Sequence, residues 1–217
     1  CVETGIQFLS TPFEQRSAEL LMSLDVPMFK MPSGEITNLA LLGHVAAYGR
    51  PMIISTGMAT MEEVSAAVNT IRQAGDPAIV LLHCVSAYPA APKDANLRAM
   101  ATLSEAFDVP VGFSDHTLGI EVAIAAAALG ACVIEKHFTL DKSLPGPDHK
   151  ASMDPAELAE LVRSIRRTEA MLGDGRKAPT ASEQRNLAGI RRGVVAARDL
   201  SKGTRLTEDM LVAKRPF

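Results

Sequence analysis

The feature that most constrains the fold is a repeated alternation between short apolar runs typical of strands and longer helical patterns. Strands are expected at residues 5–10, 27–31, 51–55, 78–84, 109–114 and 131–138. Helices are expected at residues 12–24, 38–48, 60–74, 96–107, 119–129 and 154–172. Thr60 with Glu63, and Asp154 with Glu157, are typical capping pairs at a helix start. This order predicts an α/β fold with a parallel sheet covered by helices.

Polar residues follow every expected strand, and they distinguish between two architectures. They are Thr11, Lys30, Thr56, His83, the run from Ser114 to His116, and Glu135 with His137. In a (β/α)8 barrel the carboxyl ends of all strands open onto one site, whereas an open doubly wound sheet gathers its site at one switch point. We therefore expect a TIM-type (β/α)8 barrel, of which strands 3 to 8 are present. About two strand–helix units would be missing at the front, so the chain, which begins at Cys1, is expected to be a fragment.

The chain is expected to divide into three parts. Residues 1–173 would form the partial barrel, and residues 174–190, rich in small and charged side chains, would form a linker. Residues 191–217 change to a short apolar run followed by a polar turn. This pattern predicts the truncated start of a small β-rich module.

Composition and charge argue against several classes of partner. The formal net charge is −3, there is no Trp, and aromatic residues make up 4%, so neither a nucleic acid nor an anionic membrane surface is indicated. The longest apolar run, residues 122–134, is too short to cross a bilayer. Two of the three cysteines lie inside apolar runs, which favours a reduced, cytoplasmic setting over a disulfide scaffold.

The strongest candidate site lies between residues 112 and 149. Glu135 and His137 alternate with Lys136, so they point to one face of the expected strand and Lys136 points to the other. If His116 ends the neighbouring strand, the two imidazoles converge, and such a pair suits a divalent transition metal. Alternatively, each histidine is a buried residue hydrogen-bonded to its surroundings, and the spacing leaves both readings open.

Two earlier loops offer groups suited to an anion. Lys30, Ser33 and the amides of the following helix could hold a phosphate or carboxylate, although an ordinary turn with a solvated lysine explains the same residues. Ser55, before another helix start, offers a further hydroxyl. His83 is expected in the site, with a core histidine as the alternative. Cys84 is interpreted as a small buried hydrophobe.

Taken together, these motifs resemble the sialic acid synthase (N-acetylneuraminate synthase) family. The family includes synthases of other nonulosonic acids and the spore-coat polysaccharide proteins. The motifs are KMPSGEITN (30–38), STGM (55–58), LHC (82–84), GFSDHT (112–117), EKHFTLD (135–141) and GPDH (146–149). The tail, residues 191–203 with 214–216, resembles the opening of the antifreeze-like module that ends such proteins.

The resemblance implies a transferase on a (β/α)8 barrel. It would condense phosphoenolpyruvate with an N-acetylated aldose, such as N-acetylmannosamine, to give a sialic acid-type nonulosonic acid and phosphate. The family also implies a divalent metal, Mn²⁺ or Mg²⁺, bound by His116 and His137, and a homodimer. Because two strands are expected to be missing, we expect no turnover of phosphoenolpyruvate by the 217-residue chain alone.

The resemblance also assigns roles to residues at the strand ends. Four of them would hold the phosphate and carboxylate of phosphoenolpyruvate: Lys30, Ser33, Ser55 and Ser114. Glu35 and Glu135 would lie near the reacting carbons as catalytic groups together with Lys30, and Glu135 would handle a proton or steady a cationic intermediate. Asp148 would hydrogen-bond the sugar hydroxyls.

Two alternatives are weighed against this function. A Schiff-base aldolase on the same scaffold would use Lys30 or Lys136 as nucleophile and would need no metal; the alternation that turns Lys136 away from Glu135 counts against it. A non-catalytic sugar-binding or scaffold remnant in surface polysaccharide biosynthesis would show metal affinity without turnover.

Overall fold

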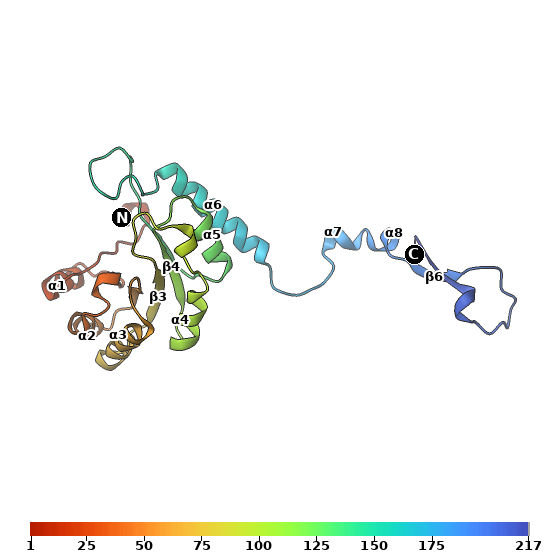
Figure 1. Ribbon diagram of the computed structural model, residues 1–217, viewed down its shortest axis with the longest axis horizontal. Coiled ribbons are helices and arrows are strands. Elements are labelled where there is room, and N and C mark those ends of the chain that lie inside the picture. Colours follow the sequence, from red (N-terminus) through yellow and green to blue (C-terminus); the bar gives the residue numbers. More distant parts are fainter. Residues whose placement is uncertain (217) are drawn as a thin grey trace. The chain divides into compact units, whose positions relative to one another are not determined.

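The computed structural model describes residues 1–216, which form two compact units divided after Leu172 (Figure 1). The larger unit is built on a curled, five-stranded parallel sheet in which sequence order equals spatial order. Its strands are β1 (Phe29–Met31), β2 (Met52–Ser55), β3 (Ile79–Cys84), β4 (Val111–Asp115) and β5 (Ile134–Lys136). Parallel strands taken in order, with a helix in each crossover, are the arrangement of a (β/α)8 barrel. The described residues form half of such a barrel.

Six helices accompany this sheet. They are α1 (Gln15–Ser23), α2 (Leu39–Ala46), α3 (Met61–Ala74), α4 (Ala99–Phe107), α5 (Glu121–Ala128) and α6 (Pro155–Leu172). Alternate strand residues such as Phe29, Met31, Met52, Ile54 and Leu81 are buried in one core with the apolar side chains of α2, α3 and α4. The other face of each strand, which carries Lys30, Ser55 and Glu135, is left for the site.

The capping pairs found in the sequence define two helix starts. Thr60 accepts from the backbone amide of Glu63, and the Glu63 carboxylate accepts from the amide of Thr60. Asp154 and Glu157 form the same reciprocal pair before α6. Each pair satisfies amides that a helix end leaves without an intrahelical partner.

Of the strands expected from the sequence, one does not form and another is shorter than expected. Residues 5–10 make no ladder with the sheet, and Ile6 and Phe8 are 65% and 48% exposed. A strand persists only where a neighbour accepts its hydrogen bonds, and among residues 1–216 β1 pairs with β2 alone. The run expected at 131–138 shortens to Ile134–Lys136, the residues in ladder register with Phe113–Asp115 of β4, although Cys132 and Val133 also exchange backbone hydrogen bonds with β4. The partial barrel that the sequence predicts, with six strands, is therefore observed within residues 1–216 as an open half-barrel of five strands.

The second unit is small. It contains an antiparallel pair, β6 (Gly193–Ala196) and β7 (Leu211–Lys214), with a single turn of 3-10 helix (Glu208–Met210) before β7. The stretch predicted as a linker, residues 174–190, carries two short helices, α7 (Ala181–Gln184) and α8 (Leu187–Ile190). Thr180 caps α7 with Glu183, which explains why a polar stretch forms a helical turn there. No helix within residues 1–216 has both the length and the apolar character needed to span a membrane.

Candidate active site

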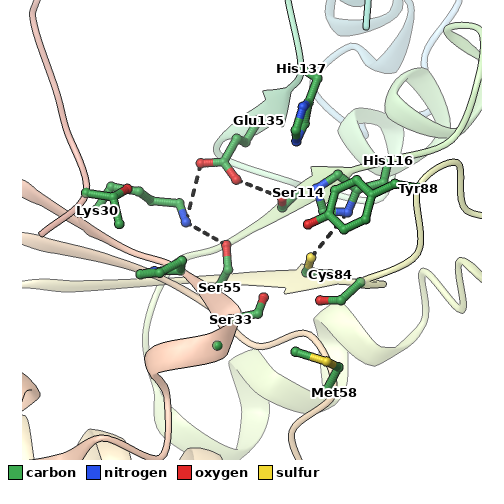
Figure 2. Close-up of a pocket in the computed structure, with 14 residues that line it drawn as sticks. Lys30, Ser33, Ser55, Met58, Cys84, Tyr88, Ser114, His116, Glu135 and His137 are labelled. Carbon is green, nitrogen blue, oxygen red and sulfur yellow. Dashed lines mark hydrogen bonds and ion pairs between the residues drawn. The ribbon is translucent and has the colours of Figure 1, made fainter. Parts of the chain in front are cut away.

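A cavity of about 410 Å³ lies at the carboxyl ends of the five parallel strands. Its walls bring together most of the polar residues expected there: Lys30, Ser33, Ser55, Ser114, His116, Glu135 and His137 (Figure 2). The convergence follows from the topology, because parallel neighbours end at the same edge and side chains two apart share a face.

Two hydrogen bonds and one ion pair link Ser55, Lys30, Glu135 and Ser114 across the cavity (Figure 2). The Lys30 ammonium donates to Ser55 Oγ at 2.8 Å and lies 3.5 Å from one carboxylate oxygen of Glu135. Ser114 Oγ donates to the other carboxylate oxygen at 2.7 Å. Burial lowers the pKa of Lys30, and the nearby Glu135 carboxylate opposes part of that shift. The arrangement holds a cation beside hydroxyl donors, which suits an anionic substrate.

A concave corner of the cavity lies beside Gly57. Its amide donates to Ser33 Oγ at 2.9 Å. A Cβ placed on Gly57 would collide with Ser86 Oγ and would come within 2.8 Å of Ser33 Oγ. Only glycine therefore leaves this corner open, and two hydroxyls and a backbone amide meet there.

His116 and His137 face each other with ring centroids 5.3 Å apart (Figure 2). His116 Nδ1 lies 2.8 Å from the carbonyl oxygen of Val85, to which it donates, so in the neutral imidazole Nε2 carries the lone pair. A histidine that ligates a metal typically has its second nitrogen held in this way. Asp148 lies 3.8 Å from His137 Nδ1. The pair fits as part of a metal site, although residues 1–216 contain no cluster of three or more His, Cys, Asp or Glu placed to hold an ion.

Cys84 and Tyr88 are site residues that the sequence reasoning missed. Cys84 Sγ lies 3.7 Å from His116 Nδ1. Burial alone would raise the pKa of the Cys84 thiol, but hydrogen bonds from His116 and Ser33 outweigh it and the pKa is lowered. The Tyr88 ring packs 4.3 Å from the His116 ring, between centroids. Alternation along β3 turns Cys84 to the face opposite His83, which is the cavity face. This alternation is the signal in the sequence that could have placed Cys84 in the cavity.

Other expected site residues lie elsewhere. His83 faces the opposite side of β3, where its Nε2 donates to the carbonyl oxygen of Ala95 at 2.9 Å, so this half-buried histidine lies outside the cavity. Glu35 is not part of the cavity wall, and its carboxylate accepts from the Asn38 side chain at 2.8 Å. Lys136 is turned away from the cavity and pairs with Asp115, so it cannot reach a substrate there as a Schiff-base nucleophile.

Sequence comparisons place this half-barrel among known proteins. A model described as the NeuB family matches residues 1–177, and a SAF domain model matches residues 191–217. The N,N'-diacetyllegionaminic acid synthase of Legionella pneumophila is 51% identical over 216 residues, which cover 98% of this chain and 61% of that protein. The human N-acetylneuraminate-9-phosphate synthase is 42% identical over 213 residues, covering 98% of this chain and 59% of that protein.

Solved structures of related proteins have the same fold as this chain. The N-acetylneuraminic acid synthetase of Leptospira borgpetersenii superposes with a TM-score of 0.79 at 40% identity, covering 85% of this chain and 65% of that one. A spore coat polysaccharide biosynthesis protein of Chromobacterium violaceum superposes with a TM-score of 0.83 at 30% identity, covering 99% and 65%. The chain spans less than two thirds of the length of these relatives. Because the family model matches most of the chain, the resemblance carried by the motifs is confirmed: the chain belongs to the NeuB family.

Proposed function

We propose that the cavity at the strand ends is part of the active site of a nonulosonic acid synthase, which condenses phosphoenolpyruvate with an N-acetylated amino sugar and releases phosphate. The observation that carries the proposal is the convergence of Lys30, Glu135 and the His116–His137 pair in one cavity. The names of the relatives support the same class of product.

Phosphoenolpyruvate would be held by the cation and hydroxyls of the cavity. Lys30, with Ser55 and Ser114, would receive one of its anionic groups, and the corner formed by Ser33 and Gly57 would receive the other. Binding at the Lys30 ammonium offsets the cost of its burial, because an anion favours the charged lysine. Two anionic groups on one small molecule match two donor clusters in one cavity.

The reaction joins C3 of phosphoenolpyruvate to the aldehyde carbon of the open-chain sugar. Water then adds at C2, and phosphate leaves with cleavage of its C–O bond, so that one water molecule is consumed for each phosphate released. Glu135 is placed to stabilise positive charge at C2 or to take the proton from the incoming water. A divalent ion held by His116 and His137 would polarise the aldehyde as a Lewis acid.

The test is phosphate release from phosphoenolpyruvate with a panel of N-acetylated hexoses and Mn²⁺, on the 217-residue chain and on the complete gene product. Release by the complete product that needs the sugar and stops with EDTA would support the proposal. Release by the 217-residue chain at an ordinary enzymatic rate would contradict the expectation that it is inactive alone. Metal binding without release in any form would instead support the sugar-binding alternative.

A further inference from the structure

Directly behind the cavity, on the opposite face of the sheet, β4 and β5 are joined by a buried ion pair. The Lys136 ammonium lies 2.7 Å from Asp115 Oδ2, and the exposed fractions of the two side chains are 6% and 0%. The two residues are register partners in the parallel ladder. Nothing in the chemistry proposed above uses either of them.

The pair closes a small ring of bonds around His116. Asp115 Oδ1 accepts from both the amide and the hydroxyl of Thr117, each at 2.8 Å. Lys136 donates a second hydrogen bond, 2.7 Å long, to the carbonyl oxygen of Thr117. The residue enclosed between Asp115 and Thr117 is His116. Its carbonyl oxygen accepts from the amide of Ala90, which holds the same segment from the other side.

The same ion pair also lies behind β5, the strand that carries Glu135. Lys136 separates Glu135 from His137, and alternation along the strand directs both of these residues to the face opposite the lysine. On β4, Ser114 and His116 flank Asp115 in the same way, and all four flanking residues line the cavity. A shift of the Lys136–Asp115 contact would therefore displace cavity groups on two strands together.

A buried ion pair is a poor source of stability, because removing two charges from water costs about as much as their attraction returns. Such a pair is better explained as a contact that fixes the positions of neighbouring side chains. We propose that Asp115 and Lys136, with Thr117, are positioning residues that hold His116 and His137 at their mutual separation and keep Glu135 beside Ser114. This inference rests on the proposed function for its kinetic part only.

The substitution Lys136→Met removes the charge and both donated bonds while keeping most of the side-chain volume. In the complete enzyme we expect kcat to fall by roughly 10- to 100-fold, as for other outer partners of site groups. KM for phosphoenolpyruvate should change by less than about threefold, since three of the four side chains proposed to hold that substrate, Lys30, Ser33 and Ser55, lie on β1, β2 and their loops and only Ser114 flanks the ion pair. Thr117→Val, which removes one hydroxyl from a nearly isosteric side chain, should lower kcat in the same direction by a smaller factor.

The matched control is Arg72→Met. Arg72 also donates from a partly buried cation to a backbone carbonyl, that of Phe107, at 2.7 Å. It does so between the carboxyl ends of α3 and α4, away from the cavity. Arg72→Met should lower the thermal midpoint but leave kcat of the folded protein within about twofold of wild type.

A second readout does not depend on turnover. The imidazole carbon and proton shifts of His116 and His137, measured by NMR, report where the two rings lie. They should move in Lys136→Met and Thr117→Val and stay in place in Arg72→Met. If the wild-type protein releases no phosphate, the proposed function fails while these spectra still test the positioning role.

The proposal is wrong if Lys136→Met and Thr117→Val leave both imidazoles and kcat unchanged. It is also wrong if Arg72→Met reproduces the loss of kcat, because the pair would then act through stability alone. Should Lys136→Met fail to fold, Thr117→Val decides the matter, since it keeps the ion pair and changes one hydrogen bond.

Discussion

At the scale of the single residue, Lys30 is the cation that faces the cavity from β1. Its replacement in Lys30→Met removes the donor to Ser55 and the partner of Glu135. A charged hydrogen bond contributes about 1.5–3 kcal/mol, so kcat/KM for phosphoenolpyruvate should fall by roughly 10- to 100-fold. Lys93→Met, an exposed lysine outside the cavity, is the control. Steady-state phosphate release in the complete enzyme measures both, and equal effects of the two substitutions would contradict the role of Lys30.

Gly57 is the second residue whose identity the cavity requires. In Gly57→Ala the new methyl group meets Ser33 Oγ and Ser86 Oγ, and these hydroxyls must turn into the space meant for the anion. KM for phosphoenolpyruvate should rise by roughly tenfold or more, with little change in thermal midpoint because flexible side chains absorb the contact. Gly43→Ala, in α2, meets its nearest neighbour at an ordinary 3.5 Å and is the control. An unchanged KM in Gly57→Ala would exclude this corner as an anion site.

At the scale of the element, the reciprocal cap of α3 fixes where that helix begins beside the cavity. Thr60→Ala removes the oxygen that accepts from the Glu63 amide and should lower the free energy of unfolding by about 1 kcal/mol. Thr180→Ala removes the equivalent cap from α7 in the second unit, so it should leave the unfolding of the larger unit unchanged. Urea denaturation followed by circular dichroism compares the two, and equal shifts would show that the units do not unfold separately.

The helices of the larger unit could be predicted from the sequence more closely than its strands. Patterns of apolar spacing and the capping pairs placed the helices α1 to α6 within a few residues of their observed positions. The same patterns predicted a strand at residues 5–10 that is not formed, because a strand depends on a neighbour that local sequence does not describe. His83 was misassigned for a related reason: which face of β3 points to the cavity depends on the curl of the whole sheet.

At the scale of the whole molecule, the half-barrel leaves β1 and β5 each paired on one side only within the described residues. Large apolar side chains such as Ile6, Phe8 and Phe13 are exposed beside it, Ile6 and Phe13 by 65% and 64%. Open edges and apolar surface favour association. We expect the 217-residue chain to bind the dye ANS and to form larger species as its concentration rises. A monomer by sedimentation at high concentration, without dye binding, would contradict this expectation.

The alternation of elements, the helix starts and the family could all be predicted from the amino-acid sequence, because they depend on local spacing and on motifs read in order. The sequence also predicted that Glu135 and His137 share one face of their strand. Three contacts became known from the folded structure alone: Cys84 and Tyr88 lie against His116, Glu35 turns to Asn38, and Lys136 pairs with Asp115 behind the cavity. Contacts between residues far apart in the chain follow from how strands curl and pair, and no local pattern encodes that geometry.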